Sequence, residues 1–197
     1  MTRRLFLTPR SPYARKVRIV LREKNLPFEL VQVDLGNRTA EFTQLSPLGK
    51  VPVLVDEDGT AIFDSTVMVE YLEDRYPAVP MIGTDWRSRL LVRALDELGD
   101  TLADNAVTAF QAKNRSDKTL EQRAMGLAEK SLVELDRRDR DGLWPEGFTA
   151  GDAAVISALG YFEVRHGRAL LERFPTVLAR AARHAGRASV AESVPTL

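Results

Sequence analysis

The sequence predicts a small α/β domain, built on a mixed four-stranded sheet, followed by an all-helical domain. Strand and helix patterns alternate over the first 76 residues, and an Asp-Gly pair within them marks a β-hairpin. No convincing strand pattern follows residue 84. We therefore expect domains at residues 1–76 and 85–197, joined by a linker at 77–84 that contains two prolines and a glycine.

The first domain opens with a strand and a well-marked helix. Arg4–Leu7 ends in a short apolar run closed by a Thr-Pro pair, which is typical of a buried strand. Ser11 followed by Pro12 predicts a helix start, because serine favours the N-cap and proline the first helical position. Apolar residues then recur at the spacing of one helix face, and the helix is expected to end near Asn25.

Five further elements complete the first domain. Residues 29–35 alternate as a half-buried strand does, and residues 39–45 fit a short helix. Val51–Val55 and Ala61–Phe63 flank the Asp-Glu-Asp-Gly turn of the predicted hairpin. Ser65–Tyr76 is expected to form the helix that follows.

The second domain is predicted to consist of long helices. Asp85 or the residue before it caps the first, and the second follows Asp117. Thr149 and Asp152 form a capping pair for an apolar helix over 153–164, and residues 175–185 form the last helix. The apolar stripes of the first two helices are expected in the core: Trp86, Leu90, Leu91, Leu95, Leu98, Leu102, Val107, Leu120, Leu127, Leu132 and Leu135.

The composition excludes several classes of protein. The chain carries 28 Lys plus Arg and 28 Asp plus Glu, so it lacks the basic excess expected of a general nucleic-acid binder. No apolar run approaches the roughly 20 residues of a membrane span, and no apolar core of a secretory signal is present. We expect a soluble, cytoplasmic protein with neither nucleic acid nor a membrane as its partner.

The first 22 residues leave alternatives open. They contain seven basic residues, and no acidic residue precedes Glu23. This bias is also typical of a mitochondrial presequence, and it could steer an anionic ligand toward the protein. The strand and helix predicted for the same residues favour a folded segment, whose charge is balanced by the acids that follow.

Side chains that could carry chemistry alone are scarce. Without cysteine, the chain has no disulfide, no thiolate ligand for a metal and no Cys nucleophile. Its two histidines, His166 and His184, lack the spacing of metal ligands, and no glycine-rich phosphate loop occurs, so no metal is expected. If the protein is an enzyme, we expect the reactive group to come from a molecule that it binds.

Four motifs together resemble the glutathione S-transferase family. They are SPYARKV at 11–17, SPLGKVPVL at 46–54, FDS at 63–65 and TAGD at 149–152, in the order and spacing of that family. Each motif is weak alone, whereas LGKVPVL followed by DS is specific. The resemblance covers nearly the whole chain and is greatest to small bacterial members with a serine at the start of the first helix.

The resemblance implies a thioredoxin-like first domain that binds glutathione as co-substrate and a helical domain that supplies the second-substrate pocket. It implies a glutathione transferase, active in detoxification, whose bound thiolate attacks a small hydrophobic electrophile. Peroxide reduction and other glutathione-dependent reactions stay open, while a mixed disulfide with the protein is ruled out because the chain has no cysteine. The alternative is a non-catalytic glutathione-binding or regulatory protein with the same fold.

Ser11 is the candidate catalytic residue. Its position fits a plain helix N-cap, and the same geometry suits an anion, because a hydroxyl and free N–H groups at a helix N-terminus stabilise negative charge. The resemblance implies that Ser11 donates a hydrogen bond to the glutathione sulfur, which lowers the pKa of that thiol. Ser11 would not act as a nucleophile itself.

The resemblance also implies the glutathione-binding residues Lys50, Val51, Pro52, Asp64 and Ser65. The Val51-Pro52 bond is expected to be cis, with Val51 pairing with the cysteinyl part of glutathione and Lys50 beside its glycine carboxylate. Asp64 and Ser65 suit the γ-glutamyl ammonium and carboxylate, although many relatives have Glu in place of Asp64. The alternatives are a proline at a strand start, a solvated lysine and an ordinary helix cap.

The second-substrate pocket is expected between the domains, near Arg10, Asn105 and Thr108, although these residues also suit plain surface. Because the family is usually dimeric, we expect a homodimer with Met68, Tyr71 and the start of the first long helix at the contact. Thr149 and Asp152 are assigned to stability alone.

Overall fold

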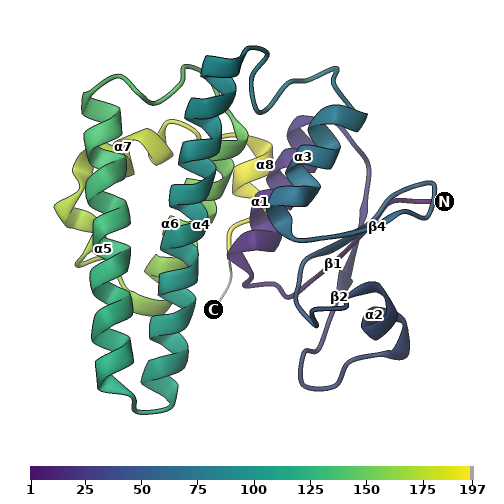
Figure 1. Cartoon of the computed structure of the whole chain (residues 1–197), viewed down its shortest axis with the longest axis horizontal. Coiled ribbons are helices and arrows are strands. Elements are labelled where there is room, and N and C mark those ends of the chain that lie inside the picture. The colour runs from purple at the N-terminus through teal and green to yellow at the C-terminus, as the bar shows by residue number, and fades with distance from the viewer. Residues whose placement is uncertain (196–197) are drawn as a thin grey trace.

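The computed structural model describes residues 1–195, and its elements form a sheet part and a helical part that lie side by side (Figure 1). The sheet part holds β1 (Arg4–Leu7), α1 (Pro12–Glu23), β2 (Glu29–Gln32), α2 (Ala40–Leu45), β3 (Val53–Val55), β4 (Ala61–Phe63) and α3 (Ser65–Arg75). The helical part holds α4 (Trp86–Asn114), α5 (Lys118–Arg140), α6 (Ala150–His166), η1 (Leu171–Arg173), α7 (Pro175–Ala182) and α8 (Ala188–Ala191). The predicted fold class is confirmed.

The sheet is mixed, with strand order β2-β1-β3-β4. β1 pairs with β2 in parallel and with β3 antiparallel, and β3 and β4 form the predicted hairpin. Successive side chains of β1 point to opposite faces. Leu5 and Leu7 pack with the buried residues of α1 and α3, whereas the Phe6 ring lies 6.3 Å from the ring of Phe42 in α2. The sheet is therefore covered on both faces.

Two predicted strands are shorter than expected. The strand predicted over 29–35 ends at Gln32, and the strand predicted over 51–55 begins at Val53. Pro52 has no N–H group to donate to a ladder, so pairing with β1 starts after it. The prediction also missed η1 and α8, which are too short to show a helical period, and it extended α7 past Ala182.

The capping pair predicted before α6 is confirmed. The Thr149 side chain accepts a hydrogen bond from the Asp152 N–H, and the Asp152 carboxylate accepts from the Thr149 N–H at 2.9 Å. Asp152 is buried and also accepts from Trp144 Nε1 at 2.8 Å. The cap therefore joins the start of α6 to the loop before it.

The core prediction for α4 and α5 is wrong at four residues. Trp86 is 77% exposed and Leu90 59% exposed, whereas Leu95 and Leu102 are fully buried. At about 100° per residue, Trp86 and Leu90 lie on a different face of α4 from the buried pair. The same geometry in α5 separates the exposed Leu120 and Leu127 from the buried Leu132 and Leu135.

Glycines let α4 and α6 pack closely. A Cβ atom on Gly99 of α4 would lie 2.7 Å from a main-chain atom of Ala154, and one on Gly151 of α6 would lie 2.6 Å from the Leu95 Cβ. Both distances are shorter than side chains tolerate, so larger residues at these positions would push the two helices apart.

Helix α1 joins the two parts. Its buried Arg15 donates hydrogen bonds to the carbonyl of Ile156 in α6 at 3.1 Å and to that of Val190 in α8 at 3.4 Å. Glu23 at the other end of α1 pairs with Arg187 just before α8. The start of the chain is thereby fixed against its end.

The segment between the two parts is also fixed in place. The buried Glu73 of α3 accepts hydrogen bonds from the N–H groups of Met81 and Ile82 and forms an ion pair with Lys24 at 2.8 Å. Burial alone would raise the pKa of Glu73, but these donors lower it overall. Within residues 1–195, no helix combines the length and the apolar character that crossing a membrane requires.

Candidate functional site

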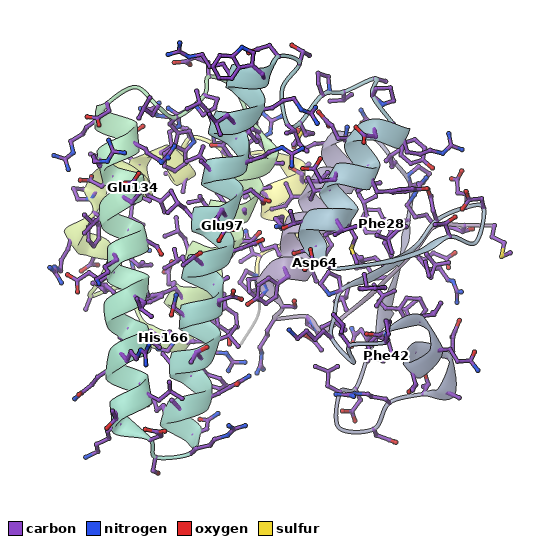
Figure 2. All side chains as sticks on the ribbon, in the orientation of Figure 1. Phe28, Phe42, Asp64, Glu97, Glu134 and His166 are labelled. Atoms are coloured by element: carbon purple, nitrogen blue, oxygen red, sulfur yellow. The ribbon has the colours of Figure 1, made fainter. Side chains whose placement is uncertain are left out.

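A cavity of about 840 Å³ lies between the sheet part and the helical part. The loops after β1, before β3 and after β4 form one wall, and α4 and α6 form the other. In Figure 2, Asp64 lies at the start of α3, between the two parts of the molecule. All but one of the residues that the sequence singled out for a site line this cavity. The residues that do so are Arg10, Ser11, Lys50, Val51, Pro52, Asp64, Ser65 and Thr108.

Ser11 is the N-cap of α1 and faces the cavity. Its Oγ accepts a hydrogen bond from the Ala14 N–H at 3.2 Å, and its own N–H donates to the Thr8 carbonyl at 3.1 Å. A hydroxyl that accepts through a lone pair keeps its proton available to donate. Ser11 can therefore cap α1 and at the same time donate to an anion in the cavity.

Hydrogen bonds fix the loop before β3. The Ser46 hydroxyl donates to the Lys50 carbonyl at 2.8 Å and accepts from the Lys50 N–H at 3.0 Å. The Val51-Pro52 bond is cis, as the resemblance implies. No residue that the structure describes makes a hydrogen bond with the main chain of Val51, which lines the cavity. This edge is open to an extended peptide ligand, which would pair as an added strand.

Asp64 is the N-cap of α3 and has a left-handed backbone, with φ 69°. Its Oδ1 accepts from the N–H groups of Thr66 at 2.9 Å and Val67 at 3.2 Å. Within residues 1–195 the second carboxylate oxygen accepts no hydrogen bond, so capping and the binding of an ammonium group are compatible. Ser65, the first residue of α3, is buried beside it and lines the cavity where the helix N-terminus favours an anion.

Two carboxylates on the helical wall have partners within the protein. Asp100 accepts from the Lys16 ammonium at 2.7 Å, and the same ammonium lies 2.9 Å from Asp96. Asp104 accepts a hydrogen bond from the Tyr13 hydroxyl. Burial and this carboxylate raise the pKa of Tyr13, so its phenol stays protonated and directs its proton at Asp104. Ser11 is therefore better placed than Tyr13 to donate to a sulfur anion.

Cationic and aromatic side chains occupy the far end of that wall. The guanidinium carbon of Arg165 lies 4.0 Å from the centroid of the Phe110 ring and 5.7 Å from that of Tyr161. Burial raises the pKa of Tyr161, and the charges of Arg165 and Arg10 partly offset this. We call the three residues Arg10, Tyr161 and Arg165 the cationic corner.

Asn105 is the predicted site residue that the structure does not bring to the cavity. Its side-chain amide donates to the Thr101 carbonyl of its own helix at 2.7 Å. Asp104, one position earlier and about 100° around α4, lines the cavity instead.

Sequence reasoning missed Tyr13 of α1 and several lining residues of the helical wall: Asp100, Asp104, Tyr161 and Arg165. One signal was available, since Asp100, Asp104 and Thr108 recur every four residues, as do Tyr161 and Arg165. Such polar stripes in otherwise apolar helices mark the faces that turn from the core.

Other places offer less chemistry. A surface hollow of about 1010 Å³ lies near Arg22–Leu30, but its Glu23 already pairs with Arg187 and accepts from Ser189. Residues 1–195 hold no cluster of three or more histidine or carboxylate side chains that could bind a metal ion.

The chain is similar to known proteins over most of its length. Residues 5–80 match the family model described as "Glutathione S-transferase, N-terminal domain". The uncharacterized GST-like protein YibF of Escherichia coli K12 is 33% identical over 162 residues, which are 79% of each protein. A glutathione S-transferase of Methylobacterium radiotolerans, solved in complex with glutathione sulfonate, is 33% identical with a TM-score of 0.91, covering 100% of this chain and 96% of that one. A glutathione S-transferase of Methylobacillus flagellatus with glutathione bound is 32% identical with a TM-score of 0.91, covering 99% and 100%.

Proposed function

The chain belongs to the glutathione S-transferase family, and from this premise we propose that it is a glutathione transferase whose substrates meet in the cavity between its two parts. The observation that carries the proposal is the Ser11 hydroxyl, which caps α1 inside this cavity and keeps its proton free to donate. The two related structures solved with glutathione or its sulfonate support glutathione as the co-substrate.

Glutathione lies along the sheet-side wall in this proposal. Its cysteinyl main chain pairs with Val51, and its glycine carboxylate lies beside Lys50. Its γ-glutamyl carboxylate binds at Ser65 and the α3 N-terminus, and its ammonium binds at Asp64. The open main chain of Val51 and the free oxygen of Asp64 support these assignments.

The thiol then lies at the N-terminus of α1. An ordinary thiol has a pKa of about 8.5, and a donated hydrogen bond together with the helix N-terminus stabilises its thiolate. The thiolate attacks an electrophilic carbon of a small hydrophobic substrate, forming a C–S bond as the leaving group departs with its electron pair. We place this reaction in the cytoplasm, in the detoxification of electrophiles.

Calorimetry and a conjugation assay test the proposed function. We expect glutathione to bind the full chain with one site per protomer, and chlorodinitrobenzene to be conjugated faster than without protein. Saturable binding without turnover on a broad panel of electrophiles would instead favour the non-catalytic alternative. Absence of glutathione binding would overturn both.

We also propose a homodimer, whose contact keeps the expected start of the first long helix but not Met68 and Tyr71. Met68 is fully buried within the protomer, because it packs in the core between α3 and the sheet, so it cannot serve a dimer contact. Tyr71 donates to Asp56 within the sheet part. The exposed apolar residues nearby are Val67 at 52%, Trp86 at 77% and Leu90 at 59%.

An apolar surface of this kind favours association. Glu70 of α3 pairs with Arg93 of α4, so the helices that carry Val67 and Leu90 are in contact. In sedimentation at micromolar concentration, we expect a species of twice 22.0 kDa that the double variant Val67→Asp/Leu90→Asp converts to 22.0 kDa. A wild-type protein that sediments only as the 22.0 kDa species would contradict the dimer.

A further inference from the structure

The cationic corner holds a charge that glutathione does not use. Glutathione carries two carboxylates and one ammonium group, which the proposed function assigns to Lys50, Ser65 and Asp64 on the sheet-side wall. Arg165 projects from α6 on the opposite wall. Its charge is therefore available to whatever occupies the helical side of the cavity.

No carboxylate of the described chain neutralises Arg165. It forms no ion pair in residues 1–195, and its buried Nε finds no hydrogen-bond acceptor there. The carboxylates on the same wall have other donors, since Asp100 is paired with Lys16 and Asp104 accepts from Tyr13. A partly buried guanidinium without an anionic partner favours an anion that arrives from outside.

Aromatic side chains fix the direction of the guanidinium. Arg165 stacks on Phe110 with its guanidinium carbon 4.0 Å from the ring centroid, which restricts its rotation. The charge of Arg10 acts on the same Tyr161 phenol that Arg165 approaches. Val107 and Phe110 of α4 supply apolar surface to the same cavity. The same wall of the cavity thus offers a cation for an anionic group and an apolar surface for a hydrophobic ring.

We propose, resting on the proposed function, that the second substrate is an aryl electrophile with a carboxylate, which Arg165 binds while the ring lies against Val107 and Phe110. The carboxylate orients the substrate with its reactive carbon toward the glutathione sulfur at Ser11. In the substitution, the C–S bond forms and the C–halogen bond breaks. The halide leaves with the electron pair of that bond, and the proton of the thiol passes to solvent.

A matched pair of electrophiles tests the proposal. Chloronitrobenzoate, with chlorine para to the carboxylate and ortho to the nitro group, is compared with the corresponding chloronitrobenzamide, which has nearly the same shape and no charge. Each value of kcat/KM is divided by the rate constant of the uncatalysed reaction at the same ionic strength, because the two rings differ in intrinsic reactivity. We expect a preference of about tenfold for the carboxylate, the size that one charged hydrogen bond supplies.

Three variants separate charge from packing. Arg165→Met keeps an unbranched side chain over Phe110 and removes the charge, so the preference should disappear. Arg165→Lys should retain part of it. Arg173 also stacks on a phenylalanine, Phe174, but does not line the cavity, so Arg173→Met should keep the wild-type preference. Equal normalised rates for the two wild-type reactions, or a preference that survives Arg165→Met, would overturn the proposal.

A binding measurement keeps the test independent of turnover. Nitrobenzoate and nitrobenzamide are titrated calorimetrically into the protein, with and without saturating S-methylglutathione. We expect nitrobenzoate to bind the wild type more tightly than nitrobenzamide does, and Arg165→Met to lose this difference. That result supports the anion site even if neither electrophile is conjugated. In that case only the catalytic assignment fails. Equal affinity of the wild type for the two probes would contradict the anion site even if conjugation proceeds.

Discussion

Replacing Ser11 by alanine should lower conjugating turnover at pH 7 by about 10- to 100-fold, because the variant loses the hydroxyl proton that stabilises the thiolate in the proposed function. Lowering the thiol pKa by about two units is worth roughly 2.7 kcal/mol and makes thiolate the major form at pH 7. Without this donor the thiol returns toward its ordinary pKa, so the acid limb of the pH–rate profile should shift upward. The loss should shrink near pH 9, where the thiol ionises unaided.

The cap that Ser11 provides needs its own control. Losing an N-cap costs about 1 kcal/mol, and Thr39 caps α2 through the same contact, accepting from the Phe42 N–H. Thr39→Ala should therefore destabilise the protein similarly without moving the pH–rate profile. If Ser11→Ala retains wild-type turnover at pH 7, Ser11 has no part in the mechanism.

Replacing Lys16 by methionine should destabilise the fold by about 3–5 kcal/mol, because it leaves Asp96 and Asp100 without their cation. The Lys16 side chain is 1% exposed and lies 2.9 Å and 2.7 Å from these two carboxylates. Burial alone would lower the pKa of Lys16, but the carboxylates raise it overall above the ordinary 10.5. The stabilisation is therefore complete at neutral pH and is lost only as the pH rises past the ordinary lysine pKa.

Chemical denaturation at pH 7 measures this loss, and two variants show its cause. Lys16→Met combined with Asp96→Asn should recover part of the stability, because the double variant no longer contains a buried Asp96 carboxylate without a cation. Arg93→Met removes a more exposed ion pair with Glu70 and should have a much smaller effect. A wild-type midpoint for Lys16→Met would show that the cluster adds nothing to stability.

Local signals were sufficient to predict most of the elements. Ser11-Pro12, the Asp-Gly turn and the Thr149–Asp152 pair each satisfy backbone groups within a few residues, so the start of α1, the hairpin and the start of α6 follow from the sequence. The faces of α4 could not be assigned in the same way. Trp86 and Leu95 are both apolar, and which of them is buried depends on where α6 packs.

The candidate site shows the same contrast between local motifs, which the sequence reveals, and helix faces, which depend on packing. Its sheet-side wall is carried by short contiguous motifs, and those residues line the cavity as expected. The helical wall depends on which face of α4 and α6 turns toward the cavity, so Asp104 and Arg165 were missed and Asn105 was included. No motif records a pairing such as that of Tyr13 with Asp104, which joins residues 91 positions apart.

The contacts of Arg15 have a consequence for biosynthesis. This residue of the first helix is hydrogen-bonded to carbonyls that lie 141 and 175 positions later in the chain. A nascent polypeptide on the ribosome therefore cannot complete the surroundings of α1 until α8 has emerged. The N-terminus of α1 lines the cavity, so translation products that stop before α8 do not carry this cavity with all the contacts that hold α1 in place.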